Sequence, residues 1–124
     1  MKSRLFILTF AALLVFGVTA LAHHSFAGSY IEDKSVTIEG KVVQFDIRNP
    51  HSFINIEVIG KDGKPARWGG EWGGVTKFTL KVGDKVIIDG APSRDTEEHK
   101  VLIRTVTRPA VGNTPEFKWG GTVR

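Results

Sequence analysis

Three histidines are the residues of this chain whose chemistry stands out. His23 and His24 are adjacent, and His51 ends the triplet Asn49-Pro50-His51. Cleavage of the chain after Ala22 would give His23 a free α-amine, and an amine and an imidazole on one residue can chelate a metal. Sites rich in nitrogen ligands suit Cu(II). We therefore predict a metal site, for copper before zinc, formed by His23 and His24 and joined by His51 if the N-terminal segment folds back.

Each of these histidines also has a purely structural interpretation. His23 and His24 can lie in a solvated arm, where they hydrogen-bond to the body or bind copper weakly, as any exposed pair does. Pro50 fixes its own φ angle and biases Asn49 towards extended geometry, and Asn is a common turn residue. A turn that begins a strand thus explains the triplet and leaves only His51 for a ligand role.

A second candidate group, for a ligand other than a metal, consists of Phe53, Trp68 and Glu71. Side chains alternate between the two faces of a strand, so Trp68 and Trp72 share one face and Glu71 lies on the other. One interpretation is a ligand platform with Glu71 as a carboxylate ligand or acid. The alternative is a pair of core aromatics and a solvated Glu. For Phe53, recognition of a ligand and cover by the C-terminal tail are equal alternatives.

Enzyme chemistry finds little support in the sequence. There is no cysteine, so thiolate catalysis and Cys-based zinc sites are excluded. None of the serines stands in a nucleophile elbow, and no carboxylate pair has an identifiable acid–base environment. The Gly-Gly pairs near Trp68 lack the Gly-Lys-Ser/Thr ending of a phosphate loop. We expect a non-enzymatic binding domain.

Residues 1–22 predict a helical signal peptide. Lys2 and Arg4 precede an apolar run that ends in the cleavage signal Ala20-Leu21-Ala22. An uncleaved membrane anchor, or cleavage after Ala20, is the alternative. Removing the two basic residues lowers the formal net charge from +4 to about +2, since +4 − 2 = +2. No large basic field then argues for a nucleic-acid partner.

The rest of the chain predicts an all-β domain behind an extended arm at residues 23–34, which Phe26, Tyr30 and Ile31 could pin to the body. Alternating apolar residues predict a hairpin within residues 35–58, broken at Asn49-Pro50-His51. The alternation changes phase along its first strand, which places a bulge or bend at Gly40.

Further strands are predicted beyond this hairpin, and the connections between them are irregular. The strands cover residues 67–72, 85–90 and 101–108, with one helical turn around residues 75–80 and a loose tail at residues 109–124 on which Phe117 and Trp119 could dock. Five short strands with one irregular connector favour a small OB-like barrel over residues 35–108. An open β-sandwich or roll is the alternative.

Four motifs together resemble a family of small exported bacterial proteins of unknown function. They are Ala22-His23-His24-Ser25-Phe26, Asn49-Pro50-His51, Trp68-Gly69-Gly70-Glu71 and Lys81-Val82-Gly83-Asp84. The chain departs from this family after Glu71, where Trp72-Gly73-Gly74-Val75 replaces a longer segment. The resemblance implies an OB-like fold and export to the periplasm of a Gram-negative bacterium, and it implies no established activity.

These observations predict an exported periplasmic domain that binds Cu(II) through its histidines. The alternative is a metal-independent module of the cell envelope that binds a small ligand or a protein through Phe53, Trp68 and Glu71. Neither a nucleic-acid partner nor membrane insertion after signal cleavage is expected. The sequence does not predict the oligomeric state.

Overall fold

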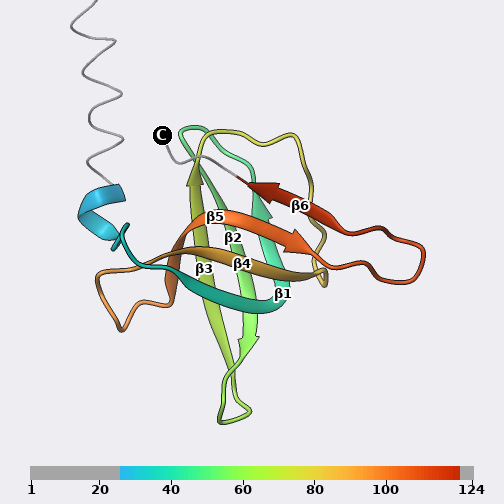
Figure 1. The fold of residues 1–124 in the computed structure, drawn as a ribbon, viewed down its shortest axis with the longest axis horizontal. Coiled ribbons are helices and arrows are strands. Elements are labelled where there is room, and N and C mark those ends of the chain that lie inside the picture. Colours follow the sequence, from blue (N-terminus) through green and yellow to red (C-terminus); the bar gives the residue numbers. More distant parts are fainter. Residues whose placement is uncertain (1–25, 121–124) are drawn as a thin grey trace, which may run out of the picture.

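The computed structural model describes residues 26–120 and has an all-β architecture (Figure 1). Its six strands are β1 Val36–Asp46, β2 His51–Ile59, β3 Pro65–Gly73, β4 Lys85–Pro92, β5 Lys100–Arg108 and β6 Phe117–Gly120. The strands pair in the order β3-β2-β1-β4-β5-β6, and a parallel contact between β3 and β5 closes the first five into a barrel. The prediction of a small five-stranded OB-like barrel is confirmed, with one extra strand.

Strand β1 belongs to both sides of this barrel. Residues 36–41 pair with β4, and residues 41–46 pair with β2. The predicted change of phase along β1 is real, but the predicted position at Gly40 is wrong, because the register shifts between Val42 and Gln44. Gly40 serves a close approach instead. A Cβ atom there would lie 2.3 Å from the carbonyl oxygen of Glu57.

Strands β2 and β3 form the long hairpin that carries most of the candidate residues. Its register runs from His51 opposite Gly73 to Ile59 opposite Pro65, so every β2 residue has a partner on β3. Of the side chains that the alternation predicted to point inward, Ile54 and Ile56 are buried and Val58 is half-buried, whereas Phe53 on the outer face is 38% exposed. The hairpin therefore presents one packed face and one accessible face.

Two expectations about the connecting segments are wrong. No helical turn forms at residues 75–80, where the chain is irregular. The expected loose tail contains β6, which pairs antiparallel with β5, with Trp119 opposite Val106. The Trp119 and Phe117 rings pack against Phe78 at centroid distances of 5.3 Å and 5.2 Å, so the tail docks through the two aromatic residues that the sequence indicated.

The main core fills the barrel and a smaller cluster lies outside it. Buried members of the main core include Val42, Ile54, Ile56, Trp72, Val86, Ile88, Val101, Ile103 and Val106. The smaller cluster joins Phe26 and Tyr30 of the N-terminal segment to Ala91 and Leu102. The predicted pinning of this segment by Phe26 and Tyr30 is thus confirmed, but the arm is not extended throughout, because residues 26–29 form a helical turn. Within residues 26–120, no helix is long and apolar enough to cross a membrane.

Candidate functional site

A chain of three polar side chains lies on the outer face of the β2–β3 hairpin. The Tyr30 hydroxyl donates a short hydrogen bond of 2.5 Å to Oε1 of Glu71. The second carboxylate oxygen of Glu71 lies 3.7 Å from Nδ1 of His51. His51 and Glu71 project from neighbouring strands, and Tyr30 reaches them from the N-terminal segment. Three segments distant in sequence therefore meet at one carboxylate.

Tyr30 is the most deeply buried of these three side chains, with only 2% of its surface exposed. Burial raises the pKa of its phenol far above the ordinary value, and the hydrogen bond to the Glu71 carboxylate adds to the effect. The phenol therefore stays protonated and acts as a fixed donor. One oxygen of Glu71 is committed to Tyr30, and the other faces His51.

The N-terminal segment reaches the site through Phe26. The ring of Phe26 stacks on the His51 ring with centroids 4.5 Å apart and planes tilted by 25°. The segment is anchored to the β4–β5 region by backbone bonds, including Ile31 N–H to the Pro92 carbonyl at 2.9 Å. Nε of Arg94 also donates to the carbonyl oxygen of Ala27 at 3.1 Å. The described part of the chain thus begins with a residue whose ring lies against His51.

Ser52 holds the turn that presents His51. Its side chain is fully buried, and its hydroxyl contacts the backbone N–H and carbonyl of Arg48, each at 3.0 Å, and the carbonyl oxygen of Gly74 at 2.8 Å. The Gly74 N–H donates in turn to the carbonyl oxygen of Pro50 at 2.7 Å. The Asn49–Pro50 peptide bond within this turn is cis. These contacts fix the start of β2.

The candidate residues predicted from the sequence do not all lie together. His51 and Glu71 meet at the site, whereas His23 and His24 lie outside the described residues. Phe53 lies opposite Glu71 in the hairpin register and borders the site. Trp68 is apart from it, because its ring packs against the core and stacks on His99 at a centroid distance of 4.8 Å. The expected shared face of Trp68 and Trp72 agrees with their common contact with the core.

Tyr30 and Ser52 contribute to the geometry of this candidate site, and sequence reasoning missed both contributions. Tyr30 was expected only to pin the arm, and Ser52 was considered only as a nucleophile. Each carries out its role through contacts with segments remote in sequence, Tyr30 with Glu71 and Ser52 with Gly74. One signal was available for Tyr30, since it is the single tyrosine of the chain and the arm around it lacks apolar periodicity.

Within residues 26–120, no group of three or more His, Asp or Glu side chains is close enough to coordinate one ion. His51 and Glu71 supply one imidazole and one carboxylate, which is a partial set of ligands.

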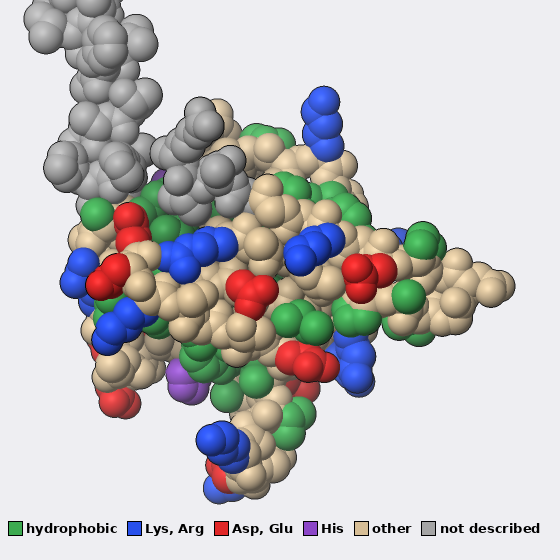
Figure 2. Space-filling model, in the orientation of Figure 1, with side chains coloured by type: hydrophobic (Ala, Val, Ile, Leu, Met, Phe, Trp, Pro, Cys, Tyr) green, Lys and Arg blue, Asp and Glu red, His purple; other side chains and the backbone are tan. Residues whose placement is uncertain are grey.

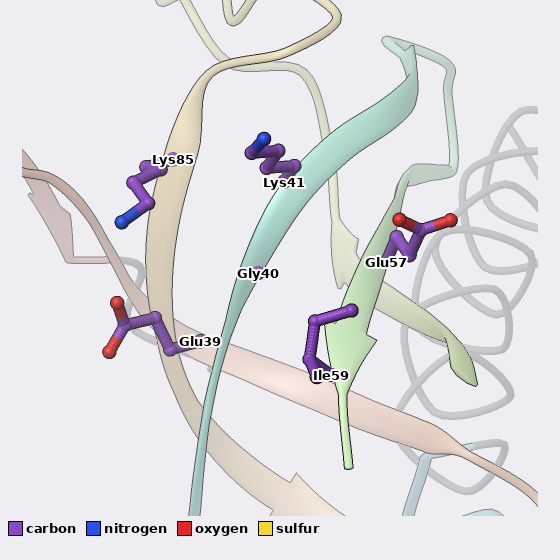
Figure 3. A pocket seen from close by; sticks show the side chains of 6 residues that line it. All are labelled: Glu39, Gly40, Lys41, Glu57, Ile59 and Lys85. Carbon is purple, nitrogen blue, oxygen red and sulfur yellow. The ribbon is translucent and has the colours of Figure 1, made fainter. Parts of the chain in front are cut away.

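A hollow elsewhere on the barrel does not bring a comparable group of polar side chains together. Its volume is about 380 Å³, and it surrounds Gly40 where β1, β2 and β4 meet. Figure 3 shows Glu39 and Lys85 on one side of Gly40 and Glu57 with Ile59 on the other. Side chains of both charge signs line this hollow, and we do not assign it a ligand.

The charges on the surface are mixed. The face shown in Figure 2 intersperses Lys and Arg side chains with Asp and Glu side chains. Some opposite charges are in contact, such as Lys100 with Glu98 at 2.9 Å and Arg48 with Asp46 at 3.3 Å. This face of the molecule offers no single-sign field of the kind that captures a polyanion.

Comparison with known proteins places the chain in a family but leaves its activity open. No curated protein matches the chain. A family model does match, and it covers residues 12–102, which include the hairpin, Tyr30, His51 and Glu71. The matched segment is well over half of the sequence. This chain therefore belongs to the family of unknown function DUF6152.

Proposed function

We propose that this protein is an exported, non-enzymatic metal-binding domain that holds Cu(II) with His51 and the histidines of its N-terminal segment. The observation that carries the proposal is the Tyr30–Glu71–His51 chain. Histidines that bind metals commonly present their second ring nitrogen to a carboxylate, which fixes the tautomer and the orientation of the ring. The Glu71 carboxylate lies 3.7 Å from Nδ1 of His51, on the side from which such a hydrogen bond would form. Nε2 is then the atom available to a metal.

The path of the N-terminal segment supports the same proposal. Phe26 stacks on His51, and only two peptide units join His24 to Phe26. Each trans unit spans about 3.8 Å between Cα atoms. The covalent chain is thus short enough to deliver the His24 imidazole to the neighbourhood of His51. If cleavage follows Ala22, the amine and ring of His23 arrive with it.

The nature of these ligands favours copper. Two or three imidazoles with an α-amine form a nitrogen-rich set, and such sets suit Cu(II) in tetragonal geometry. Glu71 is a carboxylate that can orient His51 or add an oxygen ligand. Zinc accepts the same donors and is the second candidate. Binding would take place outside the cytoplasm, in the periplasm, since the leader-like residues 1–22 predict export.

The test is a Cu(II) titration of protein with its naturally processed N-terminus. We expect one tight equivalent per chain and an electron paramagnetic resonance spectrum with nitrogen splitting. His51→Ala should lower the affinity at least tenfold and remove one nitrogen from the spectrum. Glu71→Gln should lower it about tenfold, as is usual for a residue that orients a ligand. An added residue before the mature N-terminus should remove the amine nitrogen.

His99→Ala is the matched control, because His99 is exposed and its ring contacts Trp68 rather than the site. It should bind copper like the unaltered protein. The proposal fails if His51→Ala and His99→Ala bind copper equally well, or if the processed protein binds no more tightly than a short peptide with two histidines.

A further inference from the structure

A small hollow next to the polar chain is a candidate site for an organic ligand. Its volume is about 160 Å³, and Phe53, Asn55, Gly69, Glu71 and Lys100 line it. The register places these residues on one patch of the outer face, with Phe53 opposite Glu71 and Asn55 opposite Gly69 on β2 and β3. Lys100 of β5 is the partner of Gly69 across the barrel closure. Tyr30 completes the wall.

Gly69 forms the floor of this hollow, and the fold does not require a glycine there. A Cβ atom at Gly69 would meet the Asn55 Oδ1 atom at 3.4 Å, an ordinary contact, and the backbone φ angle is not positive. The next residue is different, because a Cβ at Gly70 would lie 2.5 Å from Cδ1 of Ile103. Glycine weakens a strand interior and often marks the close approach of a ligand.

The polar groups around the hollow indicate what charge it accepts. One Glu71 oxygen accepts the hydrogen bond of the Tyr30 hydroxyl, and the other lies 3.7 Å from Nδ1 of His51. Lys100 has three N–H donors, and its Nζ contacts Oε1 of Glu98 at 2.9 Å in a pair that is about half exposed. Such exposed pairs are weak. Lys100 is therefore the group with donors to offer an incoming acceptor.

We propose that this hollow binds a small aromatic carboxylate. The ring would lie over the Gly69–Gly70 backbone and against Phe53, whose side chain is available at 38% exposure. The carboxylate would accept hydrogen bonds from Nζ of Lys100, which are strengthened by the charge on both partners. The hollow is small, at about 160 Å³, so we propose a single-ring compound as the ligand. This site does not depend on the proposed metal site.

The experiment is an amide-shift titration by nuclear magnetic resonance on chelator-treated protein, with benzoate as the probe and benzylamine as its cationic match. Benzoate should shift the Gly69, Gly70 and Leu102 amides and reach saturation. Benzylamine should produce at most weak, unsaturated shifts. Gly69→Ala should weaken benzoate binding at least fivefold by filling the floor, and Lys100→Gln should weaken it to a similar extent.

Two further variants keep the result interpretable. Gly120→Ala is the control, since it adds the same methyl on β6, where a Cβ atom meets only Cγ2 of Thr105 at 3.8 Å. Phe53→Ala tests the ring contact without disturbing the core. The proposal is overturned if benzoate gives no saturating shifts, if benzylamine binds as tightly as benzoate, or if Gly69→Ala binds benzoate like Gly120→Ala. Because no metal is present, failure here leaves the copper proposal standing, and the reverse also holds.

Discussion

The two faces of the β2–β3 hairpin are built from the same strands, but one packs into the core and the other carries the candidate site. The inner face carries Ile54, Ile56 and Trp72, each with 2% or less of its surface exposed. The outer face carries His51, Phe53 and Glu71, which are half-buried or exposed. Because side chains alternate along a strand, each residue added to one face forces its neighbour onto the other. Stability and candidate chemistry are thus interleaved residue by residue.

The faces also differ in the kind of contact that holds them. On the inner side, Trp72 packs against the rings of Phe45, Phe78 and Trp119 at centroid distances of 5.6 Å to 6.2 Å. These contacts are apolar and tolerate several arrangements. On the outer side, the Tyr30 hydroxyl and the Glu71 carboxylate meet through one directional hydrogen bond. The inner face therefore determines how stable the barrel is, and the outer face determines where particular atoms lie.

The largest expected effect separates the two faces by aromatic truncation. Trp72→Ala should lower the free energy of unfolding by about 3–5 kcal/mol, since it empties a large volume in the core. Phe53→Ala, one strand away on the outer face, should cost less than about 1 kcal/mol because its ring is partly in solvent. Urea denaturation of both variants measures the contrast. Equal losses would show that the outer face is also part of the core.

A smaller effect distinguishes the faces with a single methyl group on adjacent residues. Gly70→Ala should destabilise the protein by about 1–3 kcal/mol through overpacking against Ile103. Gly69→Ala should be neutral or stabilise it by up to about 1 kcal/mol, because it removes the entropic cost of glycine in a strand. Thermal and urea unfolding of the two variants give the comparison. A destabilised Gly69→Ala would mean that the fold, and not a ligand, requires this glycine.

The last prediction concerns how the buried Tyr30 phenol and its hydrogen bond to Glu71 on the outer face make stability depend on pH. The pKa of Tyr30 is raised in the folded protein, so the folded state retains this proton at a pH where the unfolded chain loses it. The stabilisation from Tyr30 is therefore complete below about pH 10 and declines above it, by up to about 1.4 kcal/mol per pH unit.

The Tyr30→Phe variant lacks this pH dependence. It keeps all the lysines, which titrate in the same pH range, so comparing it with the unaltered protein cancels their contribution. The difference in unfolding free energy between the two proteins should shrink as the pH rises above about 10. Tyr30 is the single tyrosine of the sequence, so tyrosinate absorbance of the folded protein reports this residue directly. Titration of that absorbance near pH 10 in folded protein would contradict the burial of the phenol.

Local patterns in the sequence predicted the barrel well and its irregular parts poorly. The alternation of apolar residues in β2 and the change of phase in β1 were both predicted from the sequence. The position of the bulge was predicted wrongly. It was assigned to Gly40 because that residue is a glycine, but the glycine is explained by its close approach to the Glu57 backbone. Strand β6 was missed because residues 109–116 break the pattern before it. Its four residues form a strand only by pairing with β5.

For the candidate site, the sequence indicated individual residues but not their grouping. His51 and Glu71 were selected for their chemistry, and the structure brings them within 3.7 Å of one another. Trp68 was selected for the same reason and lies apart, stacked on His99. Nothing in the local sequence distinguishes these outcomes. The type of a residue shows what chemistry its side chain can do, but the register between strands sets how far it lies from the other candidates.

The sequence by itself determined the all-β class, the two faces of the hairpin and the identity of the histidines, because strand periodicity and residue chemistry are local properties. Only the tertiary structure decided that Tyr30 and Phe26 return to the hairpin, and that Glu71 lies between Tyr30 and His51. Those contacts depend on the closure of β3 against β5 and on the docking of the N-terminal segment along β4 and β5. Packing between distant segments sets such distances, and no short-range pattern encodes them.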